Sequence, residues 1–294
     1  MMTCQEVRSG HPVARIGMIN FINTAPLYEV WKRTVHRPDW LVAEAVPLTI
    51  NRLLSIGELD LGFISSHEYA VHPDRYLLLP DLSISASGSV GSVYFFASKE
   101  LAELDGEKLL LTSHSQTSVS LLKIILEEFT GVRPHYHSGA ISENQAVLNH
   151  YAGILAIGDE ALDLKQHGDF PIRIDLSKVW WEQTGLPFVF AVWAARRDFC
   201  RREPVEMAEI HGELVRCLRE GLADLKAISA EVAPRIPMDP EDCYRYLRGI
   251  EYDLGPAKQQ GLALFYDYLI KRGEGVATAL PLQFWDKSRK VEGA

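Results

Sequence analysis

The sequence predicts an α/β protein whose two lobes are joined by two crossing segments around a central cleft. Strand-like and helix-like stretches alternate in residues 15–71 and again in residues 109–162. A β-rich segment with a glycine- and serine-rich centre, residues 82–98, separates the two series. Because such alternation favours a parallel sheet with right-handed crossovers, each series predicts one sheet. Two sheets connected twice leave a cleft between them that suits a small ligand.

The first unit is the stretch RIGMINFINTAPLY, from Arg15 to Tyr28. Arg15 to Asn20 alternate as in a short strand, and Pro26 indicates the first turn of a helix. Asn20 and Asn23 are therefore expected at the carboxyl end of the strand, where open α/β sheets bind ligands. The same pattern also fits an ordinary strand–helix unit in which asparagine caps the helix. The residues leave both interpretations open.

The next two strands repeat this arrangement. Leu41 to Leu48 predicts a second strand, and Thr49 is expected to cap the helix that follows it. Asp60 to Ile64 predicts a buried third strand. Ser65 and Ser66 come directly after it and open a short helix, so Ser66 is expected at the ligand-binding edge of the sheet.

Two segments are candidates for the connections between the lobes. Leu82 to Ser98 has β-rich ends around a glycine-rich centre, which fits either a strand that crosses between lobes or a plain hairpin. Leu186 to Ala194 is strongly apolar and is expected to return the chain to the first lobe. We therefore expect residues 13–97 plus 188–294 to form lobe one and residues 98–187 to form lobe two.

The second lobe begins with the strand Leu109 to Thr112 and the polar turn Ser113 to Ser118. A strongly apolar helix follows and is expected to end at Gly131. Serine and threonine near its start can cap the helix and leave N–H groups free for an anion. A helix is expected from Ser142 to Tyr151.

The rest of the chain predicts one more strand of the second lobe and then mainly helices. Ala152 to Ile157 is a buried strand with Asp159 near its end, and from Arg201 onward the apolar residues recur at helical spacing. Trp180 and Trp181 are interpreted as packing residues, since no basic residues surround them.

Composition excludes several classes of function. The chain has 294 residues, 47% hydrophobic and 23% charged, and a net charge of −9, which argues against nonspecific nucleic-acid binding. No stretch is long and apolar enough for a membrane span, and no signal peptide is evident, so we expect a cytoplasmic protein. The four cysteines are scattered and expected to be reduced thiols. The sequence does not indicate the oligomeric state.

Conventional catalytic and cofactor motifs are missing. There is no phosphate-binding glycine loop, nucleophile elbow or zinc-protease motif, and the pair His135 and His137 is weak support for a metal. We therefore expect no metal and no cofactor. Small neutral hydrogen-bonding residues gather instead at strand ends, and they suit a ligand that bears carboxylates and hydroxyls. They are Asn20, Asn23, Thr24, Ser65, Ser66, Ser87, Ser92, Ser113, Thr117 and Ser118.

Six motifs in order carry a family resemblance. They are RIGMINFINTAPLY (15–28), DLGFISSHEYA (60–70), LSISASGSVGSVYFFAS (82–98), LLLTSHSQTSVSLLKIIL (109–126), ILAIGDEAL (154–162) and TGLPFVFAVWA (184–194). Together they resemble the MqnA family, the chorismate dehydratases of the futalosine pathway of menaquinone biosynthesis. The resemblance covers nearly all of the chain beyond Pro12, and the N-terminal run through Pro12 is interpreted as unstructured and without function.

The resemblance implies a fold and a reaction. The fold is the periplasmic-binding-protein type II fold, and the reaction converts chorismate to 3-[(1-carboxyvinyl)oxy]benzoate with loss of water. Two alternatives remain open: the sister enzyme 1,4-dihydroxy-6-naphthoate synthase, and a non-catalytic cytoplasmic binding protein with the same fold. The FINTAPLY and TGLPFVFAVWA motifs favour the dehydratase.

The resemblance also implies site residues. The active-site asparagine of the family corresponds to Asn23, which we assign to orienting the substrate, because a neutral amide is a poor base. Serines of the crossing segment and the start of the following helix are expected around the carboxylates. The residues predicted to bind substrate are Ser66, Ser87, Gly88, Ser92, Ser113, Thr117, Ser118 and Asp159.

Overall fold

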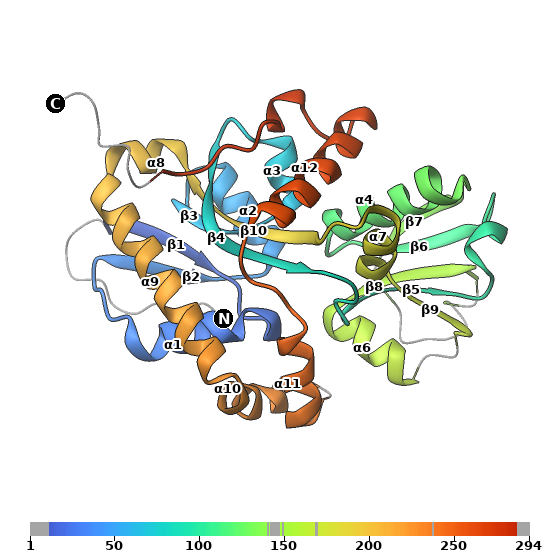
Figure 1. Ribbon diagram of the computed structural model, residues 1–294, viewed down its shortest axis with the longest axis horizontal. Coiled ribbons are helices and arrows are strands. Elements are labelled where there is room, and N and C mark those ends of the chain that lie inside the picture. Colours follow the sequence, from blue (N-terminus) through green and yellow to red (C-terminus); the bar gives the residue numbers. More distant parts are fainter. Residues whose placement is uncertain are drawn as a thin grey trace.

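The computed structural model (Figure 1) describes residues 12–139, 141, 148, 150–167, 170–236 and 238–286. Residues 1–11 of the N-terminal run through Pro12, and most of the helix expected from Ser142 to Tyr151, lie outside these residues. Within them, no helix combines the length and apolar character needed to cross a bilayer. Cys200, Cys217 and Cys243 are buried free thiols, as expected.

The first sheet has five strands and forms the centre of the lobe that holds the start of the chain (Figure 1). In sheet order they are β2 (Trp40–Glu44), β1 (Ala14–Met18), β3 (Leu61–Ser65), β10 (Phe188–Arg196) and β4 (Tyr76–Ala86). Strand β1 is parallel to β2 and β3, as the alternating pattern predicts, whereas β10 runs antiparallel to both β3 and β4.

The second sheet also has five strands. In sheet order they are β7 (His135–Gly139), β6 (Lys108–Thr112), β8 (Gly153–Ile157), β5 (Val93–Ala97) and β9 (Ile172–Asp175). Strand β6 is parallel to β7 and β8, and β5 is antiparallel to β8 and β9. The two lobes are therefore both built on mixed α/β sheets, which agrees with the predicted fold class.

The connection between the sheets decides between the crossing strand and the hairpin. Strand β4 pairs with β10 in the first sheet, and β5 pairs with β8 in the second, so the segment is a crossing and the hairpin alternative is wrong. We expected the first part of lobe one to end at residue 97, but the strand pairing places this boundary earlier. The chain leaves the first sheet after Ala86 and enters the second sheet at Val93. All five residues of β5 are buried, and such a strand fits the interior of either sheet.

The helices of lobe one pack on its sheet and on one another. They are α1 (Ala25–Thr34), α2 (Pro47–Ser55), α3 (Ser66–Val71), α8 (Arg197–Arg202), α9 (Pro204–Ala223), α10 (Leu225–Val232), α11 (Pro240–Arg248) and α12 (Pro256–Lys271). Lobe two has α4 (Gln116–Ile124), continued by the π-helical turn η3 (Ile125–Thr130), together with α6 (Gly158–His167) and α7 (Leu176–Thr184).

Two helix ends follow the residues expected to fix them, whereas a third expected cap is wrong. Ser65 caps α3 by accepting a hydrogen bond from the Glu68 N–H at 3.1 Å, and Gly131 ends η3 with a φ of 77°, as expected. Thr49 does not cap the second helix, because α2 already begins at Pro47 and β2 ends at Glu44. A proline is favoured in the first helical turn, so the helix starts before the threonine.

An aromatic cluster joins the two lobes beside the return crossing. Trp180 of α7 is fully buried, and its ring centroid lies 5.3 Å from that of Phe188 in β10 and 6.3 Å from that of Phe265 in α12. On the same side, Arg272 Nη1 lies 2.9 Å from Glu127 Oε2 of η3. These contacts confirm the packing role of Trp180 and hold lobe two against α12 of lobe one.

Candidate functional site

Asn23 lies in the short 3₁₀ helix η1 (Ile22–Thr24), between β1 and α1. The residue that precedes α1 is Thr24, which makes no side-chain capping bond. Its hydroxyl instead donates back to the carbonyl oxygens of Ile19 at 2.6 Å and Phe21 at 2.8 Å. The half-buried Asn23 side chain makes no hydrogen bond within the described part of the chain. Asn23 therefore does not act as the cap of α1, and its amide is available to a ligand.

A small cavity of about 20 Å³ lies beside Asn23 inside lobe one. Its lining is mostly apolar and includes Phe63 and Trp193, whereas its polar residues include Ser83 and Tyr252. Tyr252 is a site residue that sequence reasoning missed. It reaches the cavity because its carbonyl oxygen accepts a 2.7 Å hydrogen bond from the Ser83 N–H of β4. No local pattern around Tyr252 signals this distant pairing.

The crossing segment, residues 87–92, carries three of the predicted residues. Ser87 is exposed, and its N–H donates to Glu251 Oε1 at 3.0 Å. Gly88 has a φ of 105°, a conformation that side-chain-bearing residues rarely adopt. Ser92 is buried, and its Oγ accepts a 3.0 Å hydrogen bond from Tyr246 Oη of α11. The segment is thus held by lobe one at Ser87 and Ser92.

Asp175 holds the same segment from lobe two. Its buried carboxylate accepts hydrogen bonds from the Gly91 N–H at 2.8 Å and, as the cap of α7, from the Ser177 N–H at 3.1 Å. Burial raises the pKa of Asp175, and these backbone hydrogen bonds oppose the rise. The carboxylate therefore links the crossing to α7.

Replacing Asp175 with alanine is expected to lower the free energy of unfolding by about 2 kcal/mol. The change removes a helix cap, worth about 1 kcal/mol, and leaves the Gly91 N–H without its acceptor, which costs about 1 kcal/mol or more. Urea denaturation measures both this variant and the control Asp239→Ala, which removes the exposed cap of α11 alone. Equal destabilisation in the two variants would contradict the linking role of Asp175.

The starts of α3 and α4 meet between the lobes. The His67 N–H donates to Thr117 Oγ1 at 3.1 Å, which brings the two predicted helix starts together. Burial lowers the pKa of His67, because it disfavours the charged imidazolium. The hydroxyl of Ser66 points elsewhere, since it donates to the Val189 carbonyl oxygen at 2.7 Å and ties α3 to β10.

The remaining predicted residues lie in lobe two. Ser118 is buried, and its N–H and Oγ both bond to Ser115 Oγ, at 3.2 and 3.0 Å, within the first turn of α4. Ser113 is exposed in the turn before that helix. Asp159 lies at the start of α6, beside Gly158, whose N–H donates to the Ser92 carbonyl oxygen at 2.8 Å. The Asp159 side chain is outside the described part of the structure.

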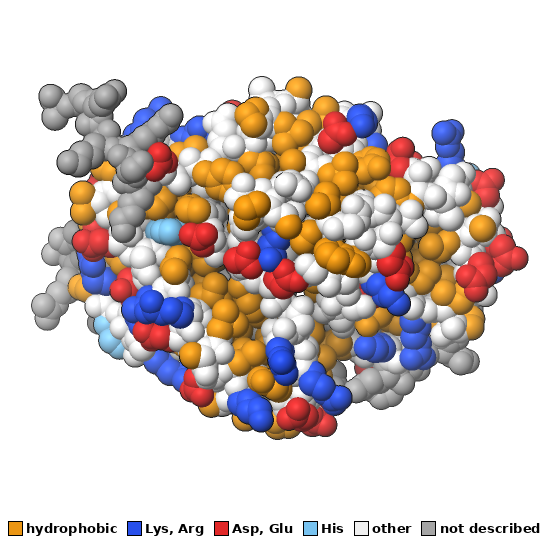
Figure 2. Space-filling view, in the orientation of Figure 1, with side chains coloured by type: hydrophobic (Ala, Val, Ile, Leu, Met, Phe, Trp, Pro, Cys, Tyr) orange, Lys and Arg blue, Asp and Glu red, His pale blue; other side chains and the backbone are white. Residues whose placement is uncertain are grey.

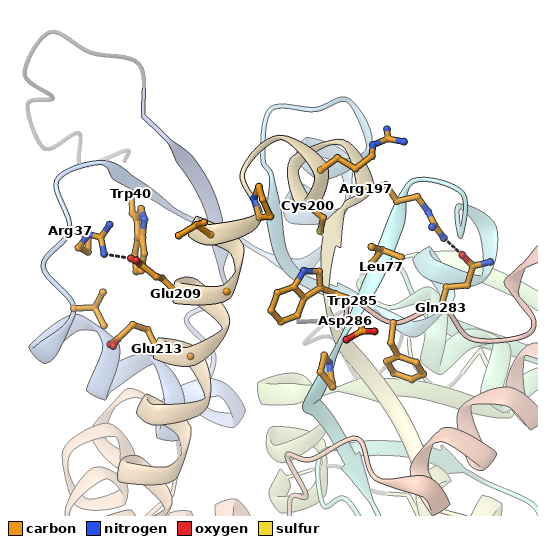
Figure 3. A pocket seen from close by; sticks show the side chains of 18 of the residues that line it. Arg37, Trp40, Leu77, Arg197, Cys200, Glu209, Glu213, Gln283, Trp285 and Asp286 are labelled. Atoms are coloured by element: carbon orange, nitrogen blue, oxygen red, sulfur yellow. Dashed lines mark hydrogen bonds and ion pairs between the residues drawn. The ribbon is translucent and has the colours of Figure 1, made fainter. Parts of the chain in front are cut away.

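A broad surface hollow lies elsewhere on lobe one, between α9 and the segment around Trp285 (Figure 3). None of the predicted site residues lines it. Two of its three arginines are engaged, as Arg37 pairs with Glu209 at 2.7 Å and Arg197 donates to Gln283 Oε1 at 2.6 Å. Burial raises the pKa of the Cys200 thiol in its wall to about 12, so that thiol is not a ready nucleophile. The hollow is larger than the cavity beside Asn23, but its side chains are less suited to a reaction.

Neither the surface charges nor the possible metal ligands indicate a further feature of the site. In the face shown in Figure 2, acidic and basic side chains are interspersed. Among the residues that the structure describes, no three His, Cys, Asp or Glu side chains are grouped closely enough to hold a metal ion. His135 and His137 are both exposed on β7.

Comparison with protein families matches residues 14–271 to the menaquinone biosynthesis family. The chain belongs to that family. Chorismate dehydratase of Thermus thermophilus is 35% identical over 271 residues, which are 86% of this chain and 94% of the relative. The 1,4-dihydroxy-6-naphthoate synthase of the same organism is 25% identical over 244 residues, 80% of this chain and 85% of that enzyme. The family resemblance of the sequence motifs is therefore confirmed.

Solved structures confirm the fold expected for this menaquinone biosynthesis family member. Protein AF1704 of Archaeoglobus fulgidus has a TM-score of 0.69 and 20% identity, covering 88% of this chain and 97% of that one. The periplasmic aliphatic sulphonate binding protein SsuA of Escherichia coli has a TM-score of 0.63 and 16% identity, covering 96% and 94%. At such identities the likeness concerns the fold alone: the fold of the periplasmic binding proteins.

Proposed function

We propose that the protein is a chorismate dehydratase, a hydro-lyase of the futalosine route to menaquinone. It eliminates water from chorismate to give 3-[(1-carboxyvinyl)oxy]benzoate. The observation that carries the proposal is the 35% identity to a chorismate dehydratase across 86% of this chain. The Asn23 amide, which has no partner in the described part of the chain, supports it. An enzyme of this pathway is expected in the cytoplasm.

The reaction depends more on how the substrate is oriented than on a strong acid or base. It removes the ring hydroxyl and a hydrogen of the neighbouring ring carbon, and the aromatic ring that forms supplies the driving force. Holding the substrate in one geometry away from water can therefore lower much of the barrier. Asn23 orients the hydroxyl or enolpyruvyl group. A carboxylate of the substrate is a stronger base than the amide, and it is the proton acceptor that we favour.

Two buried hydroxyls are suited to the substrate's carboxylates. Ser92 accepts a bond from Tyr246 Oη, and Thr117 accepts one from the His67 N–H. Each oxygen is thereby fixed, while neither hydroxyl hydrogen has an acceptor among the described residues. Because the protein carries a net charge of −9, anion recognition must be local, and such positioned donors provide it.

Incubating the purified protein with chorismate, and following the ultraviolet spectrum of the aromatic product, tests the proposal. Formation of 3-[(1-carboxyvinyl)oxy]benzoate is the expected result. Binding of chorismate without product would favour the non-catalytic binding protein. Turnover of a cyclic futalosine derivative instead would favour the naphthoate synthase, whose lower identity of 25% already makes it the weaker candidate.

Replacing Ser92 with alanine is expected to weaken chorismate binding by about 1–2 kcal/mol, roughly a 5- to 30-fold rise in Kd. The variant loses a hydrogen bond to a charged group. Calorimetric titration measures the effect, with Ser98→Ala as the control, since Ser98 is exposed at the end of β5. If both Ser92→Ala and Ser87→Ala bind chorismate with parental affinity, the crossing segment does not hold the carboxylates.

A further inference from the structure

Two polar groups without protein partners line the cavity beside Asn23. Tyr252 is 7% exposed, and its hydroxyl has no hydrogen-bond partner among the residues that the structure describes. The Asn23 amide makes no hydrogen bond within the described residues either. The other polar residues that line the cavity have partners. The Ser83 hydroxyl donates to the Asp253 carbonyl oxygen, the Thr24 hydroxyl donates to the Ile19 carbonyl oxygen, and the Tyr28 hydroxyl donates to Glu44. A buried hydroxyl without a partner costs free energy, so its presence in a native fold calls for a ligand or an ordered water.

The position of Tyr252 is fixed by the fold. Its carbonyl oxygen accepts from the Ser83 N–H, and the neighbouring residue Glu251 forms a bridge with Ser85 of β4. The Tyr252 side chain is buried, and a ring packed in the interior is confined by its neighbours. The hydroxyl is thus held in place before any ligand arrives, as a preorganised donor should be.

The size of the cavity limits what it can hold. Its volume of about 20 Å³ accommodates about one water molecule, and a water needs at least two polar partners. Asn23 and Tyr252 both line the cavity, and we assign their amide and hydroxyl as these two partners. The cavity therefore suits a single oxygen that can both donate and accept, such as water or an alcohol hydroxyl, and it is too small for a carboxylate-bearing ring.

We propose that this cavity receives the hydroxyl group that leaves the substrate and holds it as water, with Tyr252 as hydrogen-bond donor and Asn23 as the second partner. The inference rests on the proposed function, in which one water is lost per substrate. It adds Tyr252 to the reacting site, as a group that touches the departing oxygen.

The step balances without a co-reactant. The carbon–oxygen bond breaks, and its electron pair leaves with the oxygen. The carbon–hydrogen bond of the neighbouring ring carbon breaks, and its pair becomes the new double bond of the aromatic ring. The released proton ends on the departing oxygen and completes the water. Tyr252 donates a hydrogen bond but keeps its proton, which fits the burial that raises its pKa well above the usual value.

Tyr252→Phe tests the role of the hydroxyl without changing the ring. We expect kcat on chorismate to fall at least about tenfold, with KM changed less than about threefold and an unchanged melting temperature. The matched control is Tyr266→Phe, which removes another fully buried hydroxyl without a partner, in α12 and away from the cavity. A parental kcat in Tyr252→Phe, or an equal loss in both variants, would overturn the inference.

Failure of the site and failure of the proposed function can be told apart. If the parent protein produces the aromatic product and Tyr252→Phe does so at the parental rate, only the role of Tyr252 is wrong. If the parent does not convert chorismate, the proposed function itself fails. A crystal structure of the parent tests the cavity independently of activity: we expect an ordered water bonded to Tyr252 Oη, and an empty cavity would contradict the proposal.

Discussion

Replacing Asn23 with aspartate is expected to lower kcat on chorismate at least about 100-fold, the size of effect seen when one preorganised donor is lost. Aspartate removes the amide donor and places a negative charge beside a substrate with two carboxylates. The melting temperature should stay close to that of the parent, because the Asn23 side chain makes no hydrogen bond within the described chain and caps no helix. Steady-state kinetics and a melting curve measure both quantities.

Two further variants separate the effect of the added charge from the effect of the lost amide. Asn20→Asp adds the same charge at an exposed position, where Asn20 Nδ2 donates to Glu44 Oε1 at 3.0 Å and Arg235 Nη1 lies 3.5 Å from Asn20 Oδ1. Asn20 does not line the cavity beside Asn23, so this variant should keep most of the turnover. Asn23→Ser adds no charge but lacks the amide, and it should lose rate. If Asn23→Asp dehydrates chorismate at the parental rate, Asn23 is not part of the site.

Elements set by local signals were predictable from the sequence. The serine cap at Ser65 and the left-handed glycine at Gly131 each act within one turn of their own helix, so the sequence alone indicates where those helices begin and end. Pro26 has the same role at the start of α1. The local pattern failed at Thr49, where the first-turn proline Pro47 outweighed the capping residue.

Features that depend on distant residues were not predictable in this way. Whether β5 pairs within lobe one or lobe two depends on β8 and β9, far along the chain, and its five buried residues fit either sheet. Tyr252 reaches the cavity beside Asn23 only through the pairing of its backbone with Ser83. The sequence thus indicated the asparagine at a strand end, but not the tyrosine that completes the cavity.

The packing of α1, the helix that follows Asn23, depends on one glycine in α9. A Cβ atom at Gly221 would lie 1.7 Å from the carbonyl oxygen of Pro26, in the first turn of α1. That contact is with backbone, so no side-chain rotation relieves it. Gly221→Ala is therefore expected to lower the free energy of unfolding by about 3 kcal/mol, since overpacking of this kind forces the two helices apart.

Gly212 provides the matched control on the same helix. It is exposed, and a Cβ atom there would have no neighbour within 4 Å, so Gly212→Ala should stabilise α9 by up to about 1 kcal/mol through helix propensity. In thermal unfolding the two alanines should thus shift the melting temperature in opposite directions, with a loss of about 6 °C or more for Gly221→Ala. Because α1 begins two residues after Asn23, a displaced α1 should also disturb Asn23. We therefore expect the molecules of Gly221→Ala that remain folded to have a lower kcat. If Gly221→Ala melts like the parent, α1 and α9 are not packed against each other at this point.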